Sequence, residues 1–389
     1  MKILFYADTV FSFGGVQRVL AVVSKALSKS CDVTILSTDV SFDFGMYEYD
    51  KSAVKFDYIT YKSPTDLQFC FCKFCSFLYK RCLCKNSATA RLYNFSFFLP
   101  RYKKMLTEKI NSGGYDVVVG VHAFLSLHLA SIRKKVNAPI VVGWMHNSYD
   151  ALFVKQNPYL PGLKSFFAFE MKRLDKVVVL TKADAASFSE QLGLTCEVIY
   201  NPLTLEPHGR ASFGHKKFLA VGRFSPLHKG FDILIKAFAL FAASNDEWCL
   251  EIVGEGEEES LYRQLIAQEQ LENKVTICPF TSDIQSHYAN ASYFVLSSRW
   301  EGQPLVLLEA MAHGLPIISS DIPVACELLS DNGASVMFAN GDVSQLACLL
   351  GRMSSLNDWE TMSRKALDFS HHFDIDETCS KWNGIFVAE

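Results

Sequence analysis

The sequence contains no apolar run of the roughly 18–20 residues that a membrane-spanning helix needs. It also shows no signal peptide at its start, because residues 1–8 are typical of a short buried strand that meets an acid, without a longer apolar stretch or a small-residue cleavage site. We therefore expect the protein to remain where it is made, on the cytoplasmic side, and exclude an integral membrane protein.

The cysteines lack the pattern of a structural metal site or a disulfide scaffold. The chain has 12 cysteines in 389 residues and no export signal, which argues against disulfides. Zinc is one interpretation of the five that cluster, but they lack paired C-x2-C knuckles and phenylalanine fills the gaps between them. We favour reduced thiols that pack as small apolar groups, and predict no metal site. The cluster comprises Cys70, Cys72, Cys75, Cys82 and Cys84.

Charge is distributed unevenly along the chain, although the net charge is only −3. Up to Thr195 there are 25 basic and 15 acidic residues, whereas the remainder has 13 basic and 26 acidic residues. A basic first half suits an anionic membrane surface or a phosphate-bearing acceptor. The alternative is that the two halves attract each other.

Short apolar runs alternate with helical stretches throughout the chain. Continuous apolar strands that alternate with helices predict parallel sheets covered on both faces, and the recurrence of this order in each half predicts two doubly wound α/β domains. The expected strands are residues 2–7, 33–37, 54–59, 116–121, 139–144, 176–180 and 197–200, then 217–222, 248–253, 274–278, 293–297, 316–319 and 334–338.

The domain boundary is expected where the chain loses periodicity. Two prolines and a glycine follow residue 201, and a new strand begins at residue 217. We therefore expect an N-terminal domain over residues 1–201, a linker over 202–215 and a second domain over 216–372. The last segment, 373–389, predicts an amphipathic helix that packs back on the first domain.

One segment of the first half, residues 66–105, breaks the alternation. It has eight basic residues and one acid, Asp66, and bulky aromatic residues lie among them. Such a composition is typical of an interfacial helix that binds an anionic membrane. Core helices with solvated basic faces are the open alternative. The basic residues that we assign to an acceptor or membrane side are Arg18, Lys73, Lys80, Arg81, Arg101, Lys103 and Lys104.

The first block with chemical character lies in the second half. Residues 221–230 follow an expected strand and precede a helix expected over residues 231–241, which places Arg223 and Lys229 beside a helix N-terminus at the carboxyl edge of a sheet. An arginine and a lysine there suit a diphosphate, since they neutralise its charge without a metal ion.

A second block, residues 301–316, also follows an expected strand. Glu301 precedes a helix expected over residues 304–313, and its carboxylate can accept hydrogen bonds from sugar hydroxyls. Glu309 falls in an apolar stretch of that helix, where a carboxylate needs donors such as a vicinal diol. The amides of Gln303, Leu305 and Val306 are placed to meet the diphosphate. The alternative puts Glu309 on an exposed stripe.

The first half offers weaker candidates. The loop 13–18 contains Gly14 and Gly15 between a strand and a helix, so its backbone can approach a ligand, but G-x-G-x-x-G is absent and dinucleotide binding is unsupported. His146 follows the strand 139–144, and His122, at the end of another strand, is its main rival. Asp374 and Asp376 form a D-x-D that opens the last helix, which favours capping over metal binding.

The motif G-R-x5-K-G, followed by E-G-x-P-x4-E-A-M-A-x-G-x-P, resembles the family-4 retaining glycosyltransferases of the GT-B fold, in which two Rossmann-like domains face a central cleft. The resemblance implies that Arg223 and Lys229 hold the donor diphosphate, that Glu301 binds the transferred sugar and that Glu309 binds the ribose. It further implies that the loop around Gly15 faces the phosphates and the acceptor. The family often has a histidine beside the sugar at the position of His146.

The function implied by this resemblance is transfer of a hexose from a nucleotide-diphosphate sugar, with UDP-sugar favoured, to a glycan or lipid-linked acceptor in surface-polysaccharide biosynthesis. Glu301 and His146 are the expected catalytic residues, with no metal or cofactor. An aromatic residue is frequent in the family at Gln303, so the choice of sugar does not follow. A nucleotide-sugar epimerase and a donor-binding protein without turnover are the alternatives.

Overall fold

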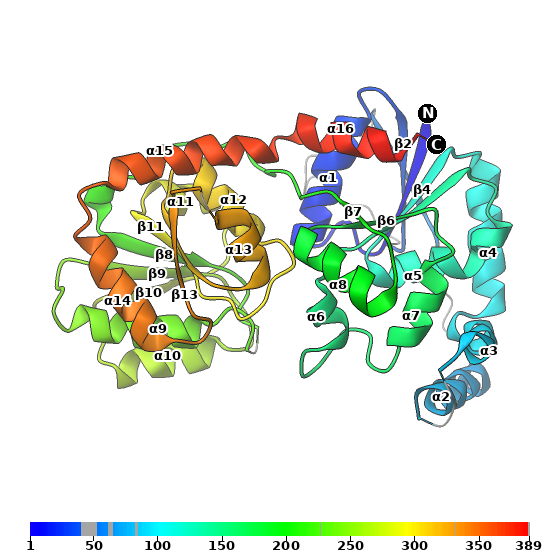
Figure 1. Cartoon of the computed structure of the whole chain (residues 1–389), viewed down its shortest axis with the longest axis horizontal. Coiled ribbons are helices and arrows are strands. Elements are labelled where there is room, and N and C mark those ends of the chain that lie inside the picture. The colour runs from blue at the N-terminus through cyan, green and yellow to red at the C-terminus, as the bar shows by residue number, and fades with distance from the viewer. Residues whose placement is uncertain (40–52, 61–64, 82–84, 226, 331, 388–389) are drawn as a thin grey trace. The chain divides into compact units, whose positions relative to one another are not determined.

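The computed structural model describes residues 1–39, 53–60, 65–81, 85–225, 227–330 and 332–387. The chain divides into two compact units, shown in Figure 1. Unit 1 consists of Met1–Pro202 and Ile375–Glu389, and unit 2 of Leu203–Asp374. Each unit has its own parallel sheet and its own core.

Within the described residues, the sheet of unit 1 has seven strands in the order β3-β2-β1-β4-β5-β6-β7, and all paired strands are parallel. Its central strands β4 and β5 are buried along their whole length, as continuous apolar runs require when helices cover both faces. The strands are β1 Lys2–Ala7, β2 Asp32–Ser37, β3 Val54–Tyr58, β4 Val117–Val121, β5 Ile140–Trp144, β6 Lys176–Val179 and β7 Glu197–Val198.

The last helix of the chain, α16 (Ile375–Ile385), belongs to unit 1, where it packs against α1 (Gly15–Leu27), as Figure 1 shows. Trp382 of this helix is fully buried, and its ring lies edge-on to Trp144 at the end of β5, with 4.9 Å between the ring centroids. Burial of large aromatic rings is the main attraction that an amphipathic helix gains from docking.

Where the structure describes it, the basic aromatic segment forms the helices α2 (Asp66–Arg81), α3 (Ser87–Phe97) and the start of α4 (Pro100–Gly113). Helices α2 and α3 pack on each other through stacked rings of Tyr79 and Tyr93, whose centroids are 4.4 Å apart. Phe166 of α7 (Lys164–Met171) packs edge-on against both tyrosines. One face of α2 therefore contributes to the core of unit 1.

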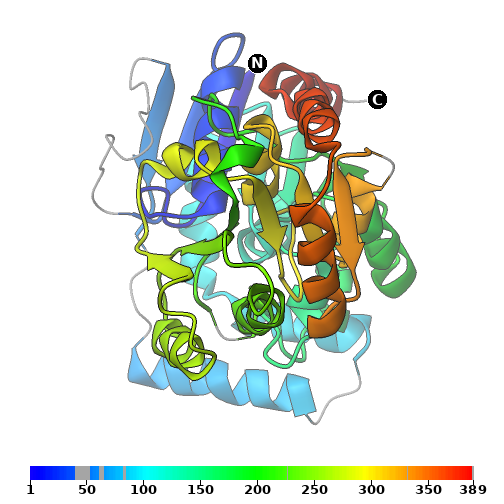
Figure 2. The same cartoon turned by 90° about the vertical axis from the view of Figure 1, so that its left-hand side faces the viewer.

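Unit 2 has a six-stranded parallel sheet in the order β10-β9-β8-β11-β12-β13. Figure 2 shows the helices α10 (Glu259–Gln268), α9 (Phe231–Ala242) and α14 (Val343–Ser354) side by side on one face, while α12 (Leu305–Ala312) packs with α15 (Trp359–Ser370). The strands are β8 Lys217–Val221, β9 Cys249–Val253, β10 Val275–Cys278, β11 Tyr293–Leu296, β12 Ile317–Ser320 and β13 Ser335–Phe338.

The predicted fold class is confirmed, and each of the thirteen predicted runs overlaps an observed strand. Residues 203–215, which we expected as a linker, fold with unit 2. The amide of Ala211 donates to the carbonyl of His313, and that of Ser212 to Ala291, so these residues are held by backbone hydrogen bonds. In the described parts of the chain, no helix has both the length and the apolarity to cross a membrane.

Candidate functional site

In each sheet the strand order reverses at one point, the topological switch point. It lies between β1 and β4 in unit 1 and between β8 and β11 in unit 2. In open parallel α/β sheets, ligands bind beyond the carboxyl ends of the strands at this switch point. Arg223 follows β8 and Glu301 follows β11, so the two motifs that are most informative in the sequence meet at the switch point of unit 2.

Lys229 is held at this edge by the glycine that follows it. Gly230 precedes α9 with a φ of 64°, a left-handed conformation that favours glycine. A Cβ at Gly230 would lie 2.1 Å from the carbonyl oxygen of Ser297, so any side chain would push the loop away from the end of β11. The hydroxyl of Ser297 also donates to the carbonyl of Lys229 over 2.8 Å. The K-G pair of the motif therefore fixes the lysine against the neighbouring strand end.

Glu301 lies within a group of donors. Lys229 Nζ donates to its Oε1 over 2.6 Å, and the hydroxyl of Ser298 donates to the same oxygen over 2.6 Å. His228 Nε2 lies 3.6 Å from Oε2. Burial acts to raise the pKa of Glu301, but Lys229 and His228 outweigh it and lower that pKa to about 2. The carboxylate is therefore ionised at neutral pH and accepts hydrogen bonds.

The two arginines near this edge differ in their contacts. Arg299 forms two hydrogen bonds to the carboxylate of Asp232, of 3.0 and 2.8 Å, which fix the loop after β11 to the start of α9. Arg223 is exposed at the end of β8. The first arginine has a structural partner, and the second presents its guanidinium to solvent.

Glu309 is almost completely buried, with 1% of its surface exposed, so the alternative of an exposed stripe is wrong. Tyr288 of α11 (Ile284–Ala289) donates its hydroxyl to Oε2 over 2.9 Å. The ring of Tyr288 stacks on that of His313, with centroids 5.1 Å apart, and His313 Nδ1 lies 2.7 Å from the carbonyl oxygen of Glu309. Sequence reasoning missed Tyr288, because nothing in α11 indicates which side chain its hydroxyl meets.

The start of α12 carries the other predicted donor-side groups. The helix begins at Leu305, and Pro304 precedes it as the N-cap residue. The amides of Leu305 and Val306 therefore belong to the first turn, where helix geometry provides no intrahelical acceptor and the dipole is positive. Gln303 is buried, with 7% of its surface exposed.

His228 and Trp300 form a further contact that the motif spacing did not reveal. His228 Nε2 lies 2.9 Å from the carbonyl oxygen of Trp300, and the two rings stack at 10° with centroids 5.1 Å apart. His228 lies within the x5 part of G-R-x5-K-G, so its place in the motif was the only signal.

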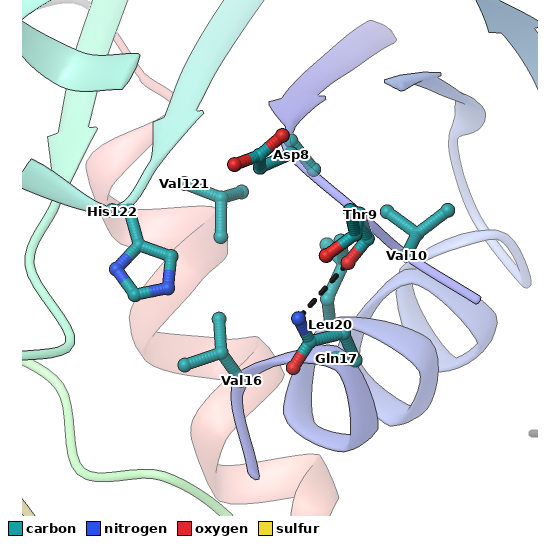
Figure 3. A pocket seen from close by; sticks show the side chains of 9 residues that line it. Asp8, Thr9, Val10, Val16, Gln17, Leu20, Val121 and His122 are labelled. Atoms are coloured by element: carbon teal, nitrogen blue, oxygen red, sulfur yellow. Dashed lines mark hydrogen bonds between the residues drawn. The ribbon is translucent and has the colours of Figure 1, made fainter. Parts of the chain in front are cut away.

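Unit 1 has a pocket of about 150 Å³ at its own switch point. Figure 3 shows His122, at the end of β4, facing Gln17 of α1 across it. The side-chain Nε2 of Gln17 donates to the backbone carbonyl of Thr9 over 2.9 Å, which connects the start of α1 to the loop after β1. A Cβ at Gly14 would lie 2.2 Å from the Gln17 side-chain oxygen, so the first glycine allows this contact. Gly15, the predicted donor-side residue, is the first residue of α1.

The two candidate histidines occupy different positions. His122 lines the pocket with a φ of 82°, which is unusual for a residue with a side chain. His146 is buried, its Nε2 has no hydrogen-bond partner, and its ring centroid lies 5.7 Å from that of His122 and 4.3 Å from that of Trp144. Burial lowers the pKa of both imidazoles below their ordinary value. His122 therefore lines the pocket, whereas His146 is buried next to His122 and does not line it.

The predicted acceptor-side cations differ in their exposure. Lys73 and Arg81 are exposed on α2, and Arg101 and Lys104 on α4, whereas Lys80 and Arg18 are half-buried. Lys103 differs from all of these, because its ammonium donates to the Asn94 side-chain oxygen over 2.5 Å, and burial lowers its pKa to about 8. The ammonium of Lys103 therefore makes its hydrogen bond inside unit 1, a contact that depends on how α3 and α4 pack.

Of the clustered cysteines, Cys82 and Cys84 lie outside the described residues, and Cys70, Cys72 and Cys75 are free thiols on α2. Within the described part of the chain, the side chains close enough to share a metal ion are instead Glu251, Cys278 and His287 in unit 2. Lys217 already lies 3.0 Å from the second carboxylate oxygen of Glu251.

Comparison with known families decides what kind of protein this is. The model of Glycosyltransferase Family 4 matches residues 13–206, and the model of Glycosyl transferases group 1 matches residues 209–366, so together they cover both units. The chain belongs to the family-4 glycosyltransferases.

Relatives support this assignment over most of the chain. An uncharacterized glycosyltransferase of Haemophilus influenzae is 29% identical over 72% of this chain and 79% of its own length. A lipopolysaccharide 1,6-galactosyltransferase of Salmonella typhimurium is 24% identical over 82% of this chain and 80% of its length. The Anabaena protein HepE, solved in complex with UDP-glucose, shares the fold with a TM-score of 0.73 at 18% identity, over 99% of this chain and 98% of HepE. The fold of the glycosyltransferase is thus GT-B.

Proposed function

We propose that the enzyme transfers a hexose from a nucleoside-diphosphate sugar, with a UDP-sugar favoured, to a glycan or lipid-linked acceptor with retention of the anomeric configuration. The observation that carries this proposal is the contact between Lys229 and Glu301 at the switch point of unit 2, beside the start of α12. A cation for the diphosphate and an ionised acceptor for sugar hydroxyls lie within one hydrogen bond of each other.

The diphosphate is proposed to bind between Arg223, Lys229 and the first-turn amides of α12. Its negative charge grows as the sugar departs, and preorganised cations and helix amides stabilise such developing charge. Arg223 is exposed and can grip a phosphate with two parallel hydrogen bonds. This arrangement needs no metal ion, and we propose that the enzyme works without one.

The ribose is proposed to bind Glu309. Its Oε2 accepts a hydrogen bond from Tyr288, which orients the carboxylate. A vicinal diol has two hydroxyl donors, and an almost fully buried carboxylate can accept hydrogen bonds from both. The UDP-glucose bound to HepE supports a uridine nucleotide as donor, by analogy of fold. No contact among the described residues identifies which sugar the nucleotide carries.

On unit 1, we propose that His122 contacts the reacting sugar or acceptor, with His146 positioning it from behind. His122 lines the pocket, and its strained backbone is typical of residues held for function. Burial keeps the imidazole neutral, so it can donate a hydrogen bond to a hydroxyl without adding charge. The pocket, with a volume of about 150 Å³, is large enough for part of one sugar ring.

We place this reaction in surface-polysaccharide biosynthesis, at the inner face of the cytoplasmic membrane. Two observations support this proposal: the relative from Salmonella acts on lipopolysaccharide, and the basic first half favours an anionic partner. A nucleotide-sugar epimerase would need acid and base carboxylates in unit 1. Among the residues that the structure describes, Asp8 is the only carboxylate that lines the pocket of unit 1.

A donor screen tests the proposal. The thermal midpoint is measured with UDP-, GDP- and ADP-sugars, and release of the nucleoside diphosphate is followed for each ligand that stabilises the protein. We expect one nucleotide, UDP, to raise the midpoint and its sugar to be turned over. Stabilisation without release under any acceptor mixture would favour the binding protein, and no stabilisation by any nucleotide sugar contradicts the donor site.

A further inference from the structure

Helix α2 carries a second apolar face that the fold does not use. Four of its bulky apolar residues recur at helical spacing and are exposed over more than half of their surface. They are Leu67 (85%), Phe71 (56%), Phe74 (59%) and Phe77 (55%). Monomeric proteins rarely expose a continuous row of this size unless it binds something.

This outward face is not the face that holds α2 to unit 1. Tyr79 and Ser76 lie on the other side, where Tyr79 is 1% exposed and stacks on Tyr93 of α3, and Ser76 shares a hydrogen bond with the Tyr93 hydroxyl. The helix is therefore attached to the protein by one face and presents the exposed row on another.

The charges around the row select the class of partner. Lys73 and Arg81 of α2 are exposed, and Lys73 Nζ lies 5.1 Å from the ring centroid of Phe69, which is also half-exposed. From residue 67 to the end of α3 the sequence has no acid. Phenylalanine and leucine flanked by lysine and arginine suit the boundary between acyl chains and anionic headgroups, where long basic side chains reach the phosphates.

Aromatic contacts connect this region to the start of α5, which directly follows His122 of the pocket. Tyr93 contacts Phe97 at 5.4 Å, and Phe97 contacts Phe124 at 6.0 Å between ring centroids. Phe124, in the first turn of α5 (Ala123–Ile132), is 49% exposed and stands two residues after His122. Ring contacts therefore lead from Tyr93 of the α2–α3 pair through Phe97 to Phe124, whose exposed ring lies in the first turn of α5, next to His122.

We propose that the outward face of α2 inserts into the surface of an anionic membrane, and that the acceptor is a lipid-linked sugar whose apolar chain reaches the pocket along Phe97 and Phe124. This inference rests on the proposed transferase function for its acceptor, but membrane binding by α2 stands on the exposed face alone. It chooses a lipid-linked acceptor over a free glycan, because only the former explains apolar contacts that lead from a membrane-binding helix to the pocket.

The experiment is flotation of the full-length protein with vesicles of phosphatidylethanolamine and phosphatidylglycerol, and with vesicles of phosphatidylcholine alone. We expect binding to the anionic vesicles and at least about tenfold weaker binding for the double variant Phe71→Ser, Phe74→Ser. The matched control is Leu240→Ser on α9, where the leucine is 57% exposed in unit 2. A Phe74→Trp variant should show a blue-shifted emission with anionic vesicles, and a Leu240→Trp variant should not.

The outcomes separate this inference from the proposed function. Stabilisation of the double variant by UDP must equal that of the parent protein, which shows that unit 2 is intact. Equal flotation of parent and double variant, or no flotation of either, overturns the inference while leaving the transferase proposal untouched. A dimer that the double variant dissociates, measured by analytical ultracentrifugation, also overturns it, because a second copy would then cover the row.

Discussion

The ammonium of Lys229 lies 2.6 Å from Oε1 of Glu301, although the two residues stand on different sheet-edge loops and are 72 residues apart in the sequence. The ion pair is largely shielded from solvent, with 12% and 8% of the two side chains exposed. In this enzyme the two motifs of the sequence are thus one physical unit. A ligand that separates the pair must supply an anion for the lysine and donors for the glutamate, as a sugar diphosphate does.

Glu301→Gln should separate sugar binding from diphosphate binding. The amide keeps the shape of the carboxylate but accepts fewer hydrogen bonds from hydroxyls and releases Lys229 from its ion pair. We therefore expect UDP to bind at least as well as to the parent protein, and the added affinity of a UDP-sugar over UDP to fall. Titration calorimetry with both ligands measures the difference. An unchanged preference for the UDP-sugar would remove Glu301 from the sugar subsite.

Glu309→Gln and Tyr288→Phe test the ribose assignment together. Tyr288→Phe removes one hydrogen bond to a buried carboxylate and should lower the free energy of unfolding by about 1–3 kcal/mol. Glu309→Gln keeps a partner for Tyr288, so it should preserve the fold but weaken nucleotide binding. The control ligand is the 2′-deoxy nucleotide. Glu309→Gln should lower the affinity for this nucleotide less than it lowers the affinity for the ribonucleotide. Equal losses for both nucleotides would argue against a ribose contact.

His122→Ala should lower kcat more than His146→Ala, because only His122 lines the pocket. His146→Ala should mainly lower stability, since it leaves a gap beside Trp144. The measurements are kcat and KM with the donor found in the screen, and thermal unfolding of both variants. A lower kcat for a fully folded His146→Ala, with His122→Ala unaffected, would reverse the two roles.

Stability should fall as the pH falls below about 6.5, the ordinary value for histidine. The pKa of His146 is lowered well below that value by burial and by the neighbouring His122. The unfolded chain therefore binds a proton that the folded chain excludes, so the free energy of unfolding decreases by about 1.4 kcal/mol per pH unit for this residue until its folded pKa is reached. Urea unfolding of the parent protein and of His146→Gln should show a shallower pH dependence in the variant. Parallel curves would mean that His146 is solvated.

The fold could be predicted from the sequence because both sheets are built from continuous apolar runs, a pattern that depends on burial alone. The place of Arg223 and Lys229 followed for the same reason, since strand ends and helix starts fix a sheet edge. Tyr288 could not be predicted, because its hydroxyl reaches Glu309 from another helix. Likewise, Lys103 lies among basic residues in the sequence, but its ammonium donates to Asn94 of the preceding helix and is partly buried, which local pattern does not show.

The histidines show the same limit. His122 and His146 both follow buried parallel strands, so the local sequence pattern does not distinguish them. The strand order does, because β4, which precedes His122, lies at the switch point and β5 does not. Residues 203–215 looked like a linker because they lack periodicity, yet irregular backbone can pack through hydrogen bonds such as that from Ala211 to His313.

The most direct test of the account is titration calorimetry of UDP into the parent protein and the double variant Arg223→Met, Lys229→Met, with Lys236→Met, an exposed lysine of α9, as the control. We expect the double variant to lose on the order of 1–3 kcal/mol of binding free energy for each charged hydrogen bond removed, while the control binds UDP as the parent protein does. If the double variant binds UDP as tightly as the parent protein, these two cations do not hold the donor diphosphate, and the donor site proposed for unit 2 is contradicted.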